Sequence, residues 1–259
     1  MRQYTALSVI GLAALLFTGT NSAQSLEKVL IPVAVVDPIP GGFDSIWVTE
    51  FVGINLSGEE AIIRQNSPEP CVLAACPIDR FPDGRVFPFT LSPGSFNGGP
   101  MFLWVEERAF DQVELHLRVQ DTSRQALTWG TSIPIVPERD AFTKRFLLMD
   151  VPTDGRFRQT LRVYDFDGLG VAQARIRIFS QDEVPMLLAE AVVTIEPVND
   201  LYPQPGIAQI GFLSDAFPVI ATSERVFVEV TPMSELDRLW GFISVTNNET
   251  QHVTVIEPN

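Results

Sequence analysis

The feature that most constrains this chain is an alternation of apolar and polar side chains with a period of two residues. In Gln112–Asp121, for example, every second residue from Val113 to Val119 is apolar and the residues between them are charged or polar. The same alternation marks Arg156–Asp165, Ala172–Ile178 and Val226–Val230. A period of two is typical of half-buried antiparallel strands, whereas an amphipathic helix repeats every 3.6 residues. We therefore predict an all-β fold.

The segment Arg156–Asp165 shows how the alternation divides a strand into two sides. In Arg156–Asp165 the apolar residues Phe157, Leu161 and Val163 lie on one side. The other side is polar and carries Arg156, Arg158, Thr160 and Arg162. We expect this second side to face water.

Turn sequences, in which glycine and asparagine supply positive φ and proline ends pairing, separate the strands. They are Pro38–Gly42, Pro82–Gly84, Asn97–Pro100, Thr153–Gly155 and Asp167–Gly168. The best helix candidate is the short segment Ser234–Trp240. Near the C-terminus, Leu239–Thr246 and Thr250–Ile256 flank an Asn-rich loop, which predicts a hairpin.

Strand density predicts two domains, residues 26–138 and 139–259. About seven strand-like segments precede the junction and about eight follow it, and each set suits a sandwich of roughly 100 residues. The junction Val136–Asp140 is polar and contains a proline, as domain boundaries often do. We predict two tandem antiparallel β-sandwiches of the Ig-like or fibronectin-like type.

Residues 1–23 have the pattern of a signal peptide. Arg2 precedes an apolar run from Tyr4 to Gly19, and small residues end at Ala23. A transmembrane anchor needs roughly 20 apolar residues, and this run is shorter. We therefore expect cleavage near Ala23 and a mature chain that is secreted or periplasmic, with no integral membrane segment.

The charge balance restricts the partners. The chain has 18 basic and 32 acidic residues and a net charge of −14, and loss of Arg2 with the signal peptide makes it −15 (17 − 32). Nucleic acids and anionic membrane surfaces require a basic footprint, so we exclude nucleic acid as a partner.

The two cysteines, Cys71 and Cys76, enclose four residues in a proline-rich stretch. An even pair in an exported chain indicates a disulfide. A redox pair or half of a metal site is the alternative, but redox motifs usually have two intervening residues and a metal site needs further ligands.

The usual catalytic patterns are weak. His116 and His252 fall on the solvent side of strands, and no Gly-x-Ser-x-Gly elbow is present. Two acidic pairs, Glu59–Glu60 and Glu106–Glu107, leave open a glycoside hydrolase that uses clustered carboxylates. We assign no catalytic residue and predict that the protein is not an enzyme.

Two segments resemble calcium ligands. Asp165 and Asp167 begin an Asp-x-Asp-Gly sequence, but position twelve of such a loop is Ile176 where a glutamate is needed. Asn199 and Asp200 resemble the linker of cadherin-like repeats. We predict no cofactor and no assigned metal ligand, and these four residues keep calcium as an open alternative.

Four tryptophans, Trp47, Trp104, Trp129 and Trp240, are spread over both halves. Exposed aromatic side chains would provide a platform for sugars. Packing between sheets or between the two domains explains them as well.

A resemblance to a known group rests mainly on residues 140–259. The residues that carry it are Leu147, Leu148, Val151, Pro152, Phe157, Arg158 and Leu161–Asp165, followed by Trp240 and Ser244–Thr254. They resemble a group of uncharacterised secreted bacterial proteins. The resemblance implies Ig-like sandwiches in an exported bacterial protein and carries over no activity or functional residue.

These observations predict a non-enzymatic exported protein that binds an unknown protein or glycan, or acts as a structural module. The alternatives are a carbohydrate-binding or calcium-assisted adhesion module and a carboxylate-dependent glycoside hydrolase.

Overall fold

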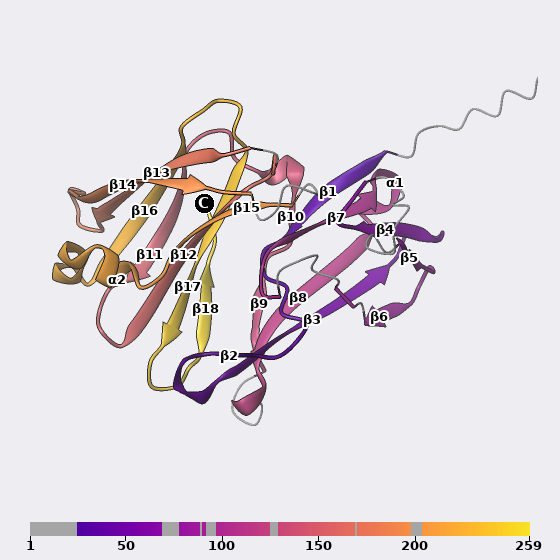
Figure 1. Ribbon diagram of the computed structural model, residues 1–259, viewed down its shortest axis with the longest axis horizontal. Coiled ribbons are helices and arrows are strands. Elements are labelled where there is room, and N and C mark those ends of the chain that lie inside the picture. Colours follow the sequence, from indigo (N-terminus) through magenta and orange to yellow (C-terminus); the bar gives the residue numbers. More distant parts are fainter. Residues whose placement is uncertain are drawn as a thin grey trace, which may run out of the picture.

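The computed structural model describes residues 25–68, 78–88, 90–91, 97–124, 129–168, 170–197 and 204–259. Within these ranges the chain forms four antiparallel sheets with only short helices between them (Figure 1). The predicted all-β class is confirmed. No helix in the described ranges has the length and apolar character to span a membrane.

Strands β1 to β10 form the first unit, which has two sheets. One sheet has the order β10 (Val136–Pro137), β1 (Leu26–Ile31), β7 (Met101–Glu106), β4 (Ala61–Gln65) and β5 (Ile78–Phe81). The other has the order β2 (Ile39–Pro40), β3 (Ile46–Asn55), β8 (Val113–Asp121) and β9 (Thr131–Ile133), and β6 (Val86–Pro88) also pairs with β3.

Strands β11 to β18 form the second unit, again with two sheets. One has the order β11 (Phe146–Pro152), β16 (Arg225–Pro232), β13 (Ala172–Ser180) and β14 (Leu187–Ile195). The other has the order β15 (Gly206–Ile210), β12 (Phe157–Asp165), β17 (Leu239–Asn247) and β18 (Val253–Ile256). The strand β10 ends at Pro137 and β11 begins at Phe146, and the division into two domains near residue 138 stays a prediction.

The helices are single turns: α1 (Glu107–Phe110), α2 (Leu213–Ala216) and the 3-10 turns η1 (Gly42–Asp44), η2 (Thr122–Arg124), η3 (Glu138–Asp140) and η4 (Pro218–Thr222). The helix considered for Ser234–Trp240 is wrong, because its last two residues start β17 and Leu236 is 83% exposed, which leaves no apolar stripe to bury. The predicted C-terminal hairpin is confirmed as β17 and β18.

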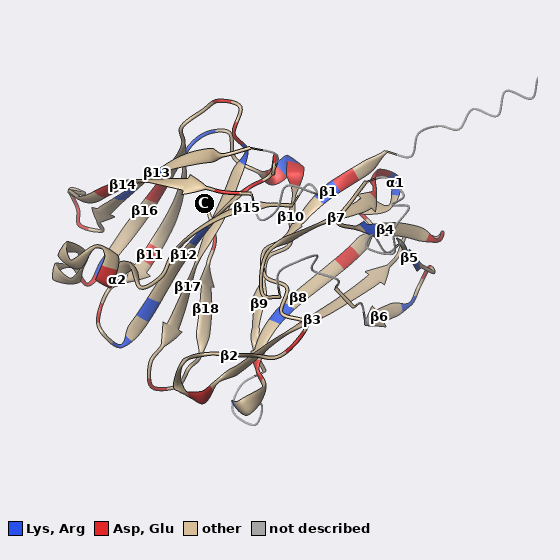
Figure 2. Cartoon of the chain, in the orientation of Figure 1, with Lys and Arg blue, Asp and Glu red and all other residues tan. Residues whose placement is uncertain are grey.

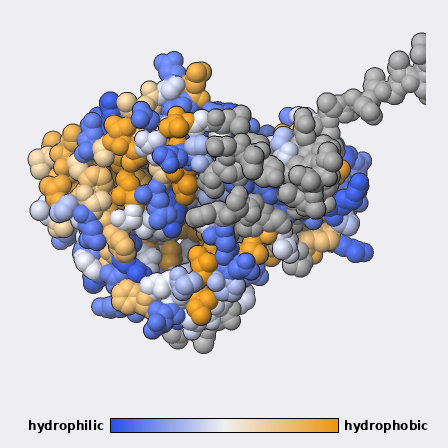
Figure 3. Space-filling model, viewed as in Figure 1, coloured by the Kyte–Doolittle hydropathy of each residue, from blue (hydrophilic) through white to orange (hydrophobic). Residues whose placement is uncertain are grey.

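Each unit encloses its own core between its two sheets. In β13, Ala172, Ala174, Ile176 and Ile178 are all buried, as the alternation predicts. In the first unit, Ile31, Phe51 and Leu117 belong to the equivalent core. On the outside, apolar residues gather over the second unit near β14 and α2 (Figure 3), and Met186 and Leu187 are exposed there.

A third buried cluster joins the two units, and we call it the interface core. It consists of Leu30, Phe102, Trp104, Val136, Tyr164, Phe166, Trp240 and Phe242. The strands β7 and β17 contribute to it because both of their faces are apolar: Leu103 and Ile243 point into the unit cores, while their neighbours Phe102 and Phe242 point into the interface. The interface core therefore holds two sheets from different units face to face.

Polar contacts at the edge of the interface core complete the junction. The buried Tyr164 hydroxyl donates to the carbonyl oxygen of Pro32 at 3.0 Å, and burial raises the pKa of this phenol, so it remains a donor. Glu138 in η3 pairs with Lys28 of the first unit at 2.8 Å and with Arg238 of the second at 2.6 Å. These charges lie beside β10, where the units meet (Figure 2).

Candidate functional site

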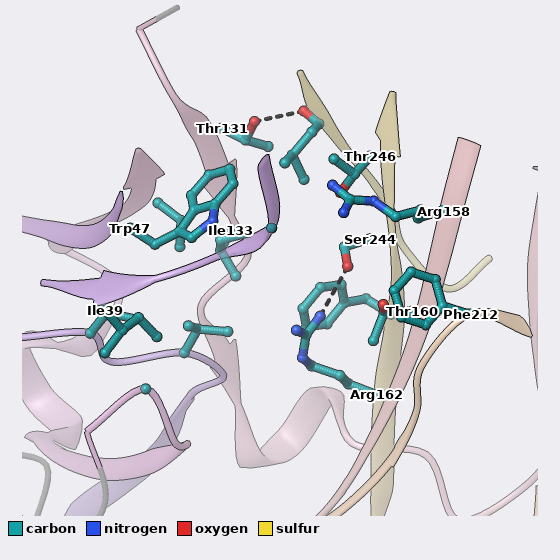
Figure 4. A pocket seen from close by; sticks show the side chains of 17 residues that line it. Ile39, Trp47, Thr131, Ile133, Arg158, Thr160, Arg162, Phe212, Ser244 and Thr246 are labelled. Carbon is teal, nitrogen blue, oxygen red and sulfur yellow. Dashed lines mark hydrogen bonds between the residues drawn. The ribbon is translucent and has the colours of Figure 1, made fainter. Parts of the chain in front are cut away.

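A cavity of about 340 Å³ lies between the two units, next to the interface core (Figure 4). One wall comes from the sheet β2–β3–β8–β9 and the other from the sheet β15–β12–β17–β18. Its volume is in the lower part of the range of small-molecule sites, which is about 300–1,000 Å³. We call this cavity the cleft.

The first unit supplies an apolar wall. Pairing of β2 with β3 sets Ile39 opposite Trp47, and β9 adds Ile133. Val33, Val35 and Val119 extend this surface, and Thr131 is the polar side chain that the first unit adds to the lining. The indole of Trp47 is therefore the one large aromatic side chain that this wall contributes among the described residues.

Local packing fixes Trp47. A Cβ atom on Gly41 would lie 2.3 Å from the indole Nε1, so only glycine lets the chain lie against the ring. Across the β3–β8 pair, Trp47 stands opposite the buried Asp121, whose carboxylate accepts hydrogen bonds from the Ile46 N–H at 2.9 Å and from Arg124 at 2.7 Å. The carboxylate thus fastens the start of β3.

We expect Asp121→Asn to lower the free energy of unfolding at neutral pH by about 1–2 kcal/mol. Burial alone would raise the pKa of Asp121, but hydrogen bonds from Ser123, Ile46 and Arg124 outweigh it and lower the pKa. A lowered folded-state pKa gives stability that is present above the unfolded pKa of about 3.9 and is lost as the pH falls through the folded value.

Urea unfolding at pH 7 and near pH 3 measures this effect. The difference between the wild type and Asp121→Asn should shrink at the acidic pH, while the control Asp182→Asn, at an exposed residue, should change the stability little at either pH. An equal difference at both pH values would contradict the assignment.

The second unit supplies a polar, cationic wall. The register of β12 and β17 sets Arg158 opposite Thr246, Thr160 opposite Ser244, and Arg162 opposite Phe242. The next pair on this face, Tyr164 and Trp240, belongs to the interface core. The same face of the sheet β15–β12–β17–β18 therefore contributes Tyr164 and Trp240 to the interface core and, further along the strands, the residues of the cleft wall.

The two arginines reach toward the apolar wall (Figure 4). Arg158 donates to Gln251 Oε1 at 2.7 Å, and burial lowers its pKa from the usual value. Arg162 donates to Ser244 Oγ at 2.9 Å. Among the described residues neither guanidinium forms an ion pair, and the lining of the cleft contains no Asp or Glu.

This wall corrects one expectation. The polar side of Arg156–Asp165 was expected to face water, yet Arg158, Thr160 and Arg162 line a cleft closed by the other unit. Only Arg156 stays outside, where it pairs with Asp154 at 2.9 Å. The apolar Trp240 and Phe242, which lie on the same face, were the available signal that this face meets another surface.

The acidic pairs considered for hydrolysis lie close together in the first unit but away from the cleft. Arg108 contacts both Glu59 and Glu106, and Glu60 pairs with an arginine of β5. Glu106 is buried and accepts a backbone N–H of β4 at 3.0 Å, while Glu107 is exposed at the start of α1. The carboxylates of Glu59, Glu60 and Glu106 are thus each paired with an arginine.

Of the four residues considered as calcium ligands, the structure describes two, Asp165 and Asp167. The buried Asp165 accepts the backbone N–H groups of Asp167 and Gly168, both at 3.1 Å, and burial raises its pKa. Asp167 pairs with Arg238, which brings a cation to this turn. Asn199 and Asp200 lie outside the described residues. In the described ranges, no group of three or more His, Cys, Asp and Glu side chains is arranged to hold a metal ion.

Of the remaining candidate residues, some lie outside the described ranges and the others are exposed. Cys71 and Cys76 and the predicted signal peptide 1–23 lie outside the described residues. His116 and His252 are exposed, as alternation predicts.

The tryptophans have three different environments. Trp104 and Trp240 lie in the interface core, and Trp47 lines the cleft. Trp129 is 77% exposed, with the Arg118 guanidinium 4.3 Å from its ring centre. Packing between the units therefore explains two of the four, and one borders the candidate site.

Comparisons with protein-family models, with curated proteins and with solved structures found no match for this chain. The resemblance to uncharacterised secreted bacterial proteins therefore stays a prediction, and the function must be argued from the cleft itself.

Proposed function

We propose that this chain is a non-enzymatic, exported binding protein that holds a small molecule in the cleft between its two units. The observation that carries the proposal is the cleft's construction: both units supply a wall, and the interface core beside it keeps the walls at a fixed separation. A preformed site of this kind loses little conformational entropy when a ligand enters.

The residues of the cleft support binding over catalysis. General acid–base catalysis needs a titratable group near the reacting atoms, most often His, Asp, Glu, Lys, Tyr or Cys. The described lining offers arginine, hydroxyl and apolar side chains, and none of those six types. Ser244 and Thr160 therefore have no base beside them to activate a hydroxyl for attack.

The strand pairing supports Ig-like sandwiches for the second unit. When its strands are lettered A to G from β11, the observed β12–β15 and β13–β16 pairs are B–E and C–F. These two pairs are central in the Ig fold, in which strands A, B, E and D form one sheet and C, F and G the other. The pairing of β11 with β16, of β13 with β14 and of β12 with β17 departs from that arrangement.

A carbohydrate is the second candidate ligand, because Trp47 on the apolar wall offers a ring face for sugar stacking. A neutral glycan would use Trp47 and the hydroxyls of Thr160 and Ser244. Its affinity would then be independent of the two arginines.

We expect Thr246→Trp to weaken capture of small molecules by at least about tenfold, because the indole fills the cleft. The measurement incubates purified protein with a metabolite extract and identifies retained compounds by mass spectrometry. Thr254→Trp is the matched control, since Thr254 lies on the adjacent β18 with its side chain exposed outside the cleft.

Compounds retained by the wild type and by Thr254→Trp but lost by Thr246→Trp support the proposal. Retention that is the same in all three proteins, or no retained compound, contradicts it. Thermal unfolding of each variant verifies that the protein is folded.

A further inference from the structure

We infer that the cleft is built for a small organic anion: a compound with an apolar or aromatic body and one acid group, such as a carboxylate. The inference rests on the proposed function and names the class of ligand. Its basis is the contrast between the two walls, one apolar around Trp47 and one cationic around Arg158 and Arg162.

Most arginines in the described ranges pair with an acidic side chain, whereas the two arginines of the cleft do not. Arg156 pairs with Asp154 and Arg225 pairs with Asp150, both outside the cleft. No ion pair of the described residues involves Arg158 or Arg162, in a chain with 32 acidic residues. A half-buried cation without a counter-charge is costly, and a ligand that brings an acid group removes this cost.

Hydroxyl groups lie between the two cations. Thr160 stands between Arg158 and Arg162 on β12, and Ser244 faces Thr160 from β17. The Ser244 oxygen accepts from Arg162, so its own O–H hydrogen remains available as a donor. An acid group above this row would receive charge-assisted hydrogen bonds from guanidinium and hydroxyl donors.

The spacing suits one acid group. The Cα atoms of Arg158 and Arg162 are separated by four residues of strand, which is about 13 Å. Both long side chains extend into the cleft, so their guanidinium groups approach the row of hydroxyls from its two ends (Figure 4). An acid group between them can be held from both sides.

The opposite wall argues for an organic ion over an inorganic one. Trp47, Ile39 and Ile133 present an apolar surface to the same cavity of about 340 Å³. A phosphate or sulfate ion would leave that surface in contact with water, whereas a ring or short alkyl chain would cover it. The overall charge of −14 does not prevent entry, because distant surface charges are screened beyond about 8 Å at physiological salt.

Isothermal titration calorimetry with para-bromobenzoate and its neutral amide, para-bromobenzamide, tests the inference. The two probes have the same ring and differ in the charge of one group. We expect the acid to bind wild-type protein at least about tenfold more tightly than the amide, a factor that corresponds to about 1.4 kcal/mol.

The variants assign this preference to the arginines. The double variant Arg158→Gln/Arg162→Gln should bind the acid at least about tenfold more weakly and lose the distinction between acid and amide. Arg156→Gln, on the same strand but outside the cleft, should behave as the wild type. The single variants should lie between these limits and serve in place of the double variant if it fails to fold.

Equal affinity for acid and amide, a preference that survives in the double variant, or no binding of the acid at millimolar concentration would overturn the inference. If the acid and the amide bind with equal affinity and Thr246→Trp abolishes the binding of both, the preference for an anion is wrong, but the proposed binding of a small molecule in the cleft still holds. The proposed function itself fails in a different experiment: the metabolite extract then yields no compound that the wild type retains and Thr246→Trp loses.

Discussion

Replacing Trp240 by alanine is expected to lower the free energy of unfolding by about 3–5 kcal/mol, the usual cost of truncating a buried aromatic side chain. Trp240 is only 5% exposed. Its ring lies 6.2 Å from that of Tyr164 and 5.6 Å from that of Phe242, measured between ring centres. The substitution leaves a cavity where the sheets of the two units meet, so the loss falls on the interface core.

Chemical denaturation of Trp240→Ala and of the matched control Trp129→Ala measures the effect. Trp129 is 77% exposed and its main described partner is the Arg118 guanidinium, so its removal should cost about 1 kcal/mol or less. Equal losses for the two variants would show that the interface core contributes no more than a surface contact, contrary to the structure described above.

Gly241→Ala is expected to destabilise the protein by about 2–3 kcal/mol, the cost of overpacking a tight site. Alanine in a strand is ordinarily more stable than glycine by roughly 0.5–1 kcal/mol, so the expected sign is reversed here. The reason is contact: a Cβ atom on Gly241 would lie 2.6 Å from the carbonyl oxygen of Arg162 on the paired strand. This steric clash is removed only if β12 and β17 move apart.

The same shift would displace the cationic wall, because Arg162 belongs to the strand that must move. Gly241→Ala should therefore also weaken binding of para-bromobenzoate. Gly211→Ala is the control, since no atom lies within 4 Å of its added Cβ. A Gly241→Ala protein that is as stable as the Gly211→Ala protein would contradict the close approach of the two strands.

The alternation in the sequence predicts most of the strands because burial of one face of a sheet determines which residues must be apolar. Residues Ala172–Ile178 illustrate this, since each apolar position there is buried. The same reasoning fails where a sheet is covered on both sides. Phe102 and Phe242 lie on strands whose two faces are both apolar there, so alternation assigns neither face to solvent, and the other unit covers these two side chains.

Local sequence patterns do not predict the candidate site, because it is formed by tertiary contacts. Trp47 and Arg158 are far apart in the sequence and meet only because the interface core sets one sheet against another. The acidic residues that the sequence offered as candidates contact other groups where the structure describes them: Glu59, Glu60, Glu106 and Asp167 pair with arginine, and Asp165 accepts backbone N–H groups. Arginine and threonine on a strand match no catalytic motif, so the alternation predicts a solvated face at the residues that form the cleft wall.

The most direct test of the account is to locate para-bromobenzoate in crystals of the wild-type protein by the anomalous scattering of its bromine. We expect the bromine to lie in the cleft on the side of Trp47, Ile39 and Ile133, with the carboxylate turned toward Arg158 and Arg162. An empty cleft, or a bromine found only at other surfaces of the protein, would contradict it.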